Sequence, residues 1–220
     1  MDIQNLISPI VPTLAPADTG SRALFLMDEN NFTQLPLVQD QKYLALVQEN
    51  ELLDWDTPES PLSKANFLHY RPAVFATGHP FEALKVAHQQ NLNIVPVVDN
   101  QNTYLGAITR DDLLKYIAEN SGLDNPGGII VLEMPPREYS LATIARICES
   151  EDVIIISSQL FTNKATGRIE ITLKTNKTDL QGLAATFERH NYGVKQVYGE
   201  QGHQEDMLER YKLLMNYINM

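Results

Sequence analysis

The sequence predicts an α+β protein: two β-α-β-β-α repeats, then a β-α-β-β-α-β domain and a C-terminal helix. Two observations support this fold class. The segment YLALVQENELL at residues 43–53 returns as YLGAITRDDLL at residues 104–114, so one unit occurs twice. After residues 119–128, which are rich in Gly, Asn and Pro, strands and helices follow a different order. The predicted parts are a first repeat, a second repeat, a linker and a last domain, at residues 1–60, 61–122, 123–128 and 129–220.

The repeat extends upstream of this segment with a nearly constant offset. Residues 35–38 read LPLV, and residues 95–98 read VPVV sixty positions later. One residue added in the second copy, between Pro96 and Tyr104, changes the offset to sixty-one. Several matches in one order indicate that about the first 125 residues are two copies of one supersecondary unit.

The elements of the unit are clearest in the second copy. Short apolar runs at residues 72–76, 93–98 and 104–108 predict strands, and two segments with helical spacing accompany them. In the helix expected over residues 79–91, we expect one helical face to hold Phe81, Leu84 and His88. In the helix expected over residues 110–120, we expect the inward side chains to be Leu113, Leu114 and Ile117.

The last domain has a different order of strands and helices. The expected elements are a strand, a helix, two strands, a helix and a strand, at residues 128–134, 139–150, 152–162, 168–175, 179–191 and 193–199. This order is typical of an antiparallel sheet with both helices on one face. In the first helix we expect one face to hold Leu141, Ile144 and Ile147. Apolar residues at helical spacing predict a C-terminal amphipathic helix over residues 203–220.

Composition narrows the class of protein. No window holds eighteen consecutive apolar residues, so no transmembrane helix is expected, and no basic segment precedes an apolar run as in a signal peptide. Cys148 is the single cysteine, which fits a reducing compartment, and its apolar neighbours favour a core residue over a catalytic thiol. We therefore expect a cytoplasmic protein that does not bind to membranes.

The net charge of −11 is unevenly distributed. Residues 1–60 hold two basic and ten acidic side chains, whereas residues 61–126 hold five and six. Binding to a nucleic-acid backbone needs clustered Lys and Arg, so no nucleic-acid partner is expected. An anionic ligand would be repelled by the first repeat and tolerated by the second.

Thr109 and Asp112 stand where the last strand of the second repeat meets its helix. The spacing Thr-x-x-Asp has the form of a capping box, in which the hydroxyl accepts a first-turn N–H and the carboxylate reaches back. Such a cap contributes about 1 kcal/mol and needs no ligand. A second interpretation is a binding site, because Gly106 leaves room in the strand and a helix N-terminus attracts phosphate.

These residues carry a resemblance to a known family. The stretch GAITRDDLL resembles the G-h-h-T-x-x-D signature of the cystathionine-β-synthase (CBS) domain, and the strand and helix order agrees. Two such units in tandem resemble a Bateman module, a regulatory receptor for adenosine-containing ligands. The resemblance covers residues 1 to about 122, and the first copy of the motif is degenerate.

The resemblance implies a ligand site in the second repeat. Asp112 would accept hydrogen bonds from ribose hydroxyls, and Thr109 would donate one to a phosphate, roles that suit a carboxylate and a hydroxyl. Gly106 would permit close approach, and Arg110 would add charge if it points inward. The walls of the adenine slot would be Phe75, Ile94, Val95 and Pro96. Plain core packing is the alternative for these four residues.

In the first repeat the motif is altered. Gln48 replaces the threonine and Glu51 the aspartate, and the surroundings are strongly acidic. A second phosphate site at Gln48 and Glu51 is therefore doubtful.

The last domain resembles an ACT domain, which has a ferredoxin-like fold. Leu141, Ile144 and the segments around Phe187 and residues 192–194 match that family. The loop in which the family binds an amino acid reads PPREY here, which is stiff and bulky. A role in packing or dimerisation is at least as well supported as ligand binding. The CBS–CBS–ACT order resembles the acetoin-utilisation regulatory proteins.

The resulting functional hypothesis is a regulatory protein without catalysis. No HExxH, GxSxG, P-loop or GxGxxG motif occurs, and the five His residues lack metal-ligand spacing. We expect an adenosine-containing ligand such as AMP, ADP or ATP, no required cofactor, no metal, a homodimer, and an unknown regulated protein. The alternative is an assembly or scaffold protein whose ligand clefts are vestigial.

Overall fold

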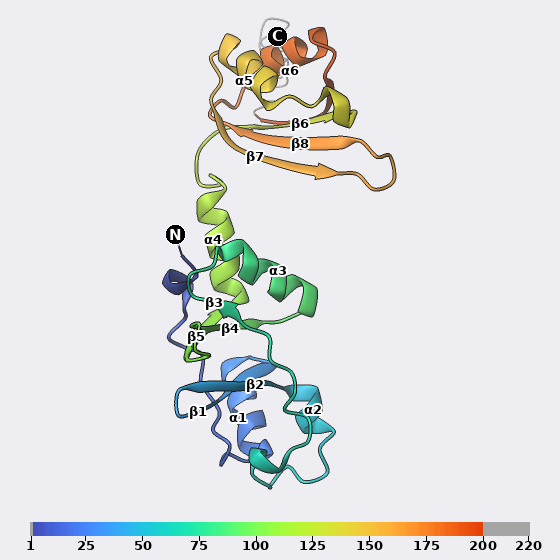
Figure 1. The fold of residues 1–220 in the computed structure, drawn as a ribbon. Helices are drawn as coiled ribbons and strands as arrows, with labels where there is room; N and C mark the ends of the chain where they lie inside the picture. Colours follow the sequence, from blue (N-terminus) through green and yellow to red (C-terminus); the bar gives the residue numbers. More distant parts are fainter. Residues whose placement is uncertain (1, 200–220) are drawn as a thin grey trace, which may run out of the picture. The chain divides into compact units, whose positions relative to one another are not determined.

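The computed structural model describes residues 2–199, and the chain divides into two compact units, Met1–Ile117 and Ala118–Met220 (Figure 1). We describe each unit by itself. The predicted C-terminal helix over residues 203–220 lies outside the described residues. Within the described part, no helix combines the length and the apolar character needed to cross a membrane.

The second repeat has the predicted element order. Its elements are β3 Val74–Phe75, α3 Pro80–Gln90, β4 Ile94–Val98, β5 Tyr104–Thr109 and α4 Arg110–Asn120. The sheet order is β3-β4-β5, with β3 parallel to β4 and β4 antiparallel to β5. The predicted strand–helix–strand–strand–helix unit is therefore confirmed in this copy.

The first repeat follows the same plan with shorter ends. Its elements are α1 Gly20–Asn30, β1 Gln34–Gln39, β2 Lys42–Gln48 and α2 Glu49–Leu53. In place of a first strand it has a single parallel bridge, Leu14 to Leu37, at the position of the pairing of Val74 with Val97. The expected first strand is thus reduced to one residue, because prolines on both sides of Leu14 cannot donate to a ladder.

Equivalent caps bound the long helices of the two repeats. The Thr19 side chain accepts from the Arg22 N–H before α1, and His79 Nδ1 accepts from the Phe81 N–H before α3. Both helices end in a left-handed asparagine, Asn31 and Asn91, a residue type that tolerates positive φ.

The two repeats exchange their leading segments. The segment before the first repeat contains the short helix η1 Ile3–Leu6, and its Ile3 is fully buried in the core of the second repeat. The Ser8 N–H then donates to the Ala107 carbonyl at 2.8 Å. Conversely, Tyr70 lies in the segment before the second repeat, and its carbonyl accepts from the Leu46 N–H of the first at 2.8 Å. Each repeat is therefore completed by the segment that leads into the other.

Two of the large apolar residues predicted on helical faces are exposed, Phe81 on α3 and Leu114, which we expected to point inward, on α4. Phe81 is 64% exposed and Leu114 is 66% exposed, whereas Leu113 is buried as expected. Helix α3 instead buries Pro80, Ala83 and Ala87. Of the face expected on α3, Leu84 packs partly against the core, whereas Phe81 and His88 are exposed, because the small alanine side chains let the helix approach the sheet closely.

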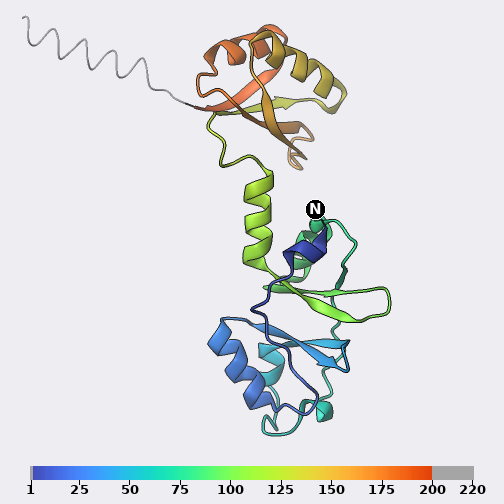
Figure 2. The same ribbon diagram turned by 90° about the vertical axis from the view of Figure 1, so that its left-hand side faces the viewer.

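The second unit is a four-stranded antiparallel sheet covered on one face by two helices, which Figure 1 and Figure 2 show clearly. The strand order is β7-β8-β6-β9, the ferredoxin-like order. The elements are β6 Ile129–Met134, α5 Leu141–Ser150, β7 Ile155–Thr162, β8 Ile169–Thr175, α6 Gln181–Arg189 and β9 Gly193–Tyr198. The predicted α+β fold class is confirmed.

Two local features of this unit complete the description. Leu141, expected on the inner face of α5, is 45% exposed, because it is the first residue of the helix; Ile144, Ile147 and Cys148 form the buried face. The PPREY loop contains a short 3₁₀ helix, Pro136–Glu138. In the first unit, a further short helix, Leu62–Lys64, precedes β3.

Candidate functional site

The junction of β5 and α4 contains the two predicted motif residues in a closed hydrogen-bonded arrangement. The Thr109 N–H donates to Asp112 Oδ2 at 3.1 Å, and the Asp112 N–H donates to Thr109 Oγ1 at 3.1 Å. The Thr109 hydroxyl also donates to Asp112 Oδ2 at 2.5 Å. Thr109 is 7% exposed. The capping box is therefore formed, and whether the same groups also hold a ligand stays a prediction.

A residue of the first repeat reaches this junction. Asn93 precedes β4, and its carbonyl accepts from the Arg110 N–H at 2.9 Å. The Asn93 N–H in turn donates to the side-chain oxygen of Gln34 at 3.0 Å. Gln34 is the first residue of β1 and is only 7% exposed. The start of α4 is thus connected to the first repeat through two hydrogen bonds.

The sequence did not single out Gln34 or Asn93. Asn93 Oδ1 is buried and has no hydrogen-bond partner within the part of the chain that the structure describes. Buried polar atoms normally have a hydrogen-bond partner, so Asn93 Oδ1 is an acceptor with unused hydrogen-bonding capacity beside the motif. The available signal was Gln34 itself, a polar residue at the start of an otherwise apolar strand.

The space beside Gly106 is occupied. Its φ is +142°, which side chains rarely adopt, and a Cβ built on it would lie 2.3 Å from Ile7 Cγ2. The close approach that this glycine permits is therefore made by the leading segment of the chain. Ile7 also packs against the core of the second repeat.

Arg110 points to the end of the neighbouring helix. Its Nε and Nη2 donate to the Leu92 carbonyl at 3.3 and 3.0 Å, and Nη2 lies 3.4 Å from Asn91 Oδ1. Leu92 and Asn91 follow α3, so the guanidinium satisfies an acceptor and meets the negative end of the helix dipole there. The Arg110 guanidinium therefore contacts the end of α3, whereas the cap hydrogen bonds of Thr109 are made with Asp112.

The four predicted wall residues differ in exposure. Ile94 pairs with Thr109 across β4 and β5 and is fully buried, and Val95 and Pro96 are buried beside it. Phe75, at the end of β3, is 53% exposed. Core packing accounts for Ile94 and Val95, whereas Phe75 is half exposed.

The first-repeat counterpart differs in hydrogen bonding and charge. Gln48 precedes α2 without a side-chain cap, in contrast to Thr109. Glu51 Oε2 is buried and has no hydrogen-bond partner within the described ranges. Burial raises the pKa of Glu51, against the lowering effect of its hydrogen bonds from Gln48. An additional negative group would be disfavoured here.

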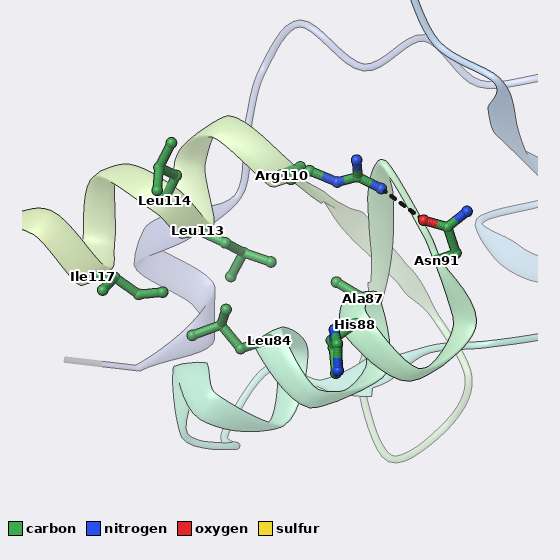
Figure 3. A pocket seen from close by; sticks show the side chains of 8 residues that line it. All are labelled: Leu84, Ala87, His88, Asn91, Arg110, Leu113, Leu114 and Ile117. Carbon is green, nitrogen blue, oxygen red and sulfur yellow. Dashed lines mark hydrogen bonds between the residues drawn. The ribbon is translucent and has the colours of Figure 1, made fainter. Parts of the chain in front are cut away.

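The first unit has an apolar groove and a separate polar hollow. An apolar groove of about 330 Å³ runs between α3 and α4 and is lined by Leu84, Ala87, His88, Asn91, Arg110, Leu113, Leu114 and Ile117 (Figure 3). A more polar hollow of about 560 Å³ is lined by Glu51, Asp54, Trp55, Asp56, Thr57, Lys64, Asn66 and Phe67. Of the predicted site residues, Arg110 lines the groove and Glu51 lines the hollow.

Cys148 is a buried core residue. It is 1% exposed, and burial raises the pKa of its thiol to about 11. A thiol that is protonated at neutral pH is a weak nucleophile and metal ligand. Among residues 2–199, no group of three or more His, Cys, Asp or Glu side chains is arranged to hold a metal ion.

Comparison with known proteins gives one family match. Residues 71–119 match the family model described as the CBS domain. This segment contains β3, α3, β4, β5 and nearly all of α4.

Several solved structures are similar to about half of the chain. A CBS domain pair/ACT domain protein from Thermotoga maritima has 20% identity and a TM-score of 0.48, covering 54% of this chain and 98% of its own. A protein from Vibrio cholerae assigned to acetoin utilization has 19% identity and a TM-score of 0.47, covering 56% and 95%. CBSX2 of Arabidopsis thaliana, solved in complex with AMP, has 19% identity and a TM-score of 0.46, covering 54% and 96%.

Because the identities and TM-scores are low, we assign no ligand or partner to this chain from these similarities. The family match and the topology are independent of them. In the first repeat, α1 has side-chain and asparagine caps equivalent to those of α3, and β1 pairs with β2 as β4 pairs with β5 in the matched segment. The chain therefore contains a CBS domain at residues 71–119, preceded by a second copy of the same fold.

Proposed function

We propose that this protein is a non-catalytic regulatory protein that binds an adenosine-containing ligand, such as AMP, ADP or ATP, in its second repeat. The observation that carries the proposal is the Thr109–Asp112 pair at the N-terminus of α4, inside a CBS domain. CBS domains are generally regulatory modules without catalysis, and the nearly neutral second repeat suits an anionic ligand better than the acidic first one.

The chemistry of the pair fits a nucleoside phosphate. The hydrogen bonds from Thr109 use Asp112 Oδ2, and Oδ1 is the carboxylate oxygen that they do not use. Ribose hydroxyls would donate to this carboxylate, because an ionised carboxylate only accepts hydrogen bonds. The Thr109 hydroxyl now donates to Asp112, so a bond to phosphate requires it to turn from the carboxylate to the ligand. The first-turn N–H groups of α4 and its dipole favour the phosphate.

Hydrogen bonds connect the site to the first repeat: the Arg110 N–H donates to the Asn93 carbonyl, and the Asn93 N–H donates to the Gln34 side chain. A ligand that orders the start of α4 also acts on Asn93, and through it on Gln34. Regulation would follow only if the ligand binds more tightly to one arrangement of the repeats than to another. The regulated protein would recognise that arrangement.

We also propose that the protein is a homodimer. The apolar groove between α3 and α4 and the exposed Phe81 and Leu114 support this, because they form an apolar surface that a second chain would cover. The single, buried Cys148 suits a reducing compartment such as the cytoplasm.

A thermal-shift screen tests ligand binding. AMP, ADP, ATP, NAD and S-adenosylmethionine are each added to the purified full chain. A specific ligand at one hundred times its dissociation constant adds about 2.7 kcal/mol to the free energy of unfolding and raises the Tm. Calorimetric titration then gives the stoichiometry, for which we expect one nucleotide per chain. No stabilisation by any of these compounds would leave the alternative, an assembly protein whose clefts are vestigial.

A further inference from the structure

The residues that line the polar hollow of the first repeat differ in burial. Three of them are half-buried, and we call these the floor: Glu51, Trp55 and Phe67. The others are exposed, and we call these the rim: Asp54, Asp56, Thr57, Lys64 and Asn66. The volume of about 560 Å³ lies within the range of small-molecule sites, about 300–1,000 Å³. The hollow is therefore large enough for an organic ligand.

The floor contains an acceptor with unused hydrogen-bonding capacity. Glu51 Oε2 is buried and has no hydrogen-bond partner among the residues that the structure describes. The equivalent Asp112 differs, because its Oδ2 accepts from the Thr109 hydroxyl and N–H. An ionised carboxylate only accepts hydrogen bonds, and a buried acceptor without a donor costs free energy. A positively charged donor in the hollow would supply the missing partner of Glu51.

Two aromatic rings form the rest of the floor. The rings of Trp55 and Phe67 meet edge to face, with centroids 5.5 Å apart and an interplanar angle of 86°. Both side chains pack against the core of the first repeat. Gly20 of α1 also lies close to Trp55, since a Cβ built on it would be 3.0 Å from Trp55 Cε3. These contacts fix the rings in place, and aromatic rings attract organic cations through their quadrupole.

The charge of the hollow is negative, and only the first repeat has it. The lining carries three carboxylates and one ammonium group, a formal charge of −2, from Glu51, Asp54, Asp56 and Lys64. At the repeat offset of sixty-one, Asp54 corresponds to Lys115 and Asp56 corresponds to Ile117. The acidic rim is thus absent from the equivalent positions of the second repeat. Together with the acidic surroundings, it raises the local concentration of cations.

We propose that the hollow binds an organic cation with two ammonium groups. One ammonium group donates to Glu51 Oε2 beside the Trp55 ring, and the other meets the carboxylates of the rim. Two positive charges balance the formal charge of the lining, and the aliphatic chain between them covers the aromatic floor. The proposed nucleotide site lies in the second repeat, so this inference goes beyond the proposed function and does not rest on it.

A fluorescence titration of the full chain tests the proposal. Trp55 is the single tryptophan of the chain, so its emission reports on this hollow alone. At constant ionic strength, putrescine should give a saturable change in emission. Butylamine, which has one ammonium group, should bind at least about tenfold more weakly. Butanediol, in which hydroxyls replace both ammonium groups of putrescine, and magnesium chloride, an inorganic dication, should give no saturable change.

Two matched variants locate the binding. Glu51→Gln keeps the shape of the side chain and removes its charge, so it should raise the dissociation constant of putrescine about tenfold. Glu29→Gln removes the same charge from the same repeat, but Glu29 is an exposed residue of α1 that does not line the hollow. It should change the dissociation constant by less than about twofold, because salt screens distant exposed charges. Circular dichroism and thermal unfolding confirm that both variants are folded.

A rim variant keeps the test independent of the floor. Asp56 is exposed, so Asp56→Asn leaves the packing of the first repeat intact. It should raise the dissociation constant of putrescine about threefold, because an exposed ion pair is worth less than one at a buried oxygen.

Three results would overturn the proposal. The first is no saturable change with putrescine up to about 10 mM, which is weaker than any useful affinity. The second is an equal response to butanediol or to magnesium chloride, which would show that the ammonium groups are not recognised. The third is equal weakening by Glu29→Gln and Glu51→Gln, which would show attraction to the acidic repeat as a whole. Nucleotide binding is measured separately in the thermal-shift screen, and its failure would leave this site unaffected.

Discussion

Removal of the Asp112 carboxylate tests the proposed site most directly. Asp112→Ala should weaken nucleotide binding by about 1.5–3 kcal/mol, the range for a hydrogen bond to a charged group, which corresponds to roughly ten- to 150-fold in the dissociation constant. The same substitution also removes the acceptor for the Thr109 N–H and hydroxyl. We therefore expect a separate loss of about 1 kcal/mol in the free energy of unfolding without ligand.

Calorimetric titration and denaturant unfolding measure these two effects in the same samples. Asp112→Asn keeps an acceptor for the cap but removes the charge, so it should retain most of the stability and still lose affinity. Glu51→Ala is the matched control, because Glu51 is the equivalent residue of the first repeat. It should bind with nearly unchanged affinity. If Glu51→Ala lost binding while Asp112→Ala kept it, the site would lie in the first repeat and the charge argument would be wrong.

Three further predictions test parts of the structure. Gly106→Ala should destabilise the protein by about 1–3 kcal/mol, because the position has a positive φ and the new Cβ clashes with Ile7. Adding Ile7→Ala to the same chain should recover the part of this loss that is due to the clash. Urea unfolding measures the stability of both variants. Thr109→Ala should cost about 1 kcal/mol of stability and Thr109→Ser much less, in thermal unfolding of the protein without ligand. Hydrogen bonds from Lys195 and Asn163 lower the pKa of Glu170, so its contribution is present above its ordinary value of 4.5 and is lost as the pH falls through the lowered value. The stability difference between wild type and Glu170→Gln should therefore shrink in acid, and a constant difference from pH 7 to pH 2 would contradict this assignment.

Sequence patterns predicted those parts of the fold that depend on local periodicity. The internal repeat identified both copies, and the order of elements after the linker identified the four-stranded sheet. Phe81, Leu84 and His88 satisfy helical spacing, but only Leu84 packs partly against the core. The sheet beneath α3 decides that Ala83 and Ala87 pack inward and that Phe81 and His88 stay exposed. The first strand was overestimated because the prolines around Leu14 limit it to one bridge.

The candidate site was predictable to the same extent. Thr109 and Asp112 are three residues apart, so their mutual capping follows from sequence alone. Gln34 and Ile7 reach the same strand and helix from distant parts of the chain, and their contacts depend on how the repeats pack. No local pattern identifies such partners. Gly106 in a strand indicated that another group approaches closely, but the sequence did not show that this group is Ile7, near the start of the chain.

The exchanged leading segments have a consequence for how this module forms. A single repeat cut out of the chain would lack the backbone partner of its last strand, Ser8 for Ala107 or Tyr70 for Leu46. It would also lack part of its core, since Ile3 fills the second repeat from outside it. The pair is therefore the smallest cooperative folding unit, and its formation waits for contacts that span about a hundred residues, which slow folding. An isolated copy would regain its missing strand only by domain swapping with another molecule.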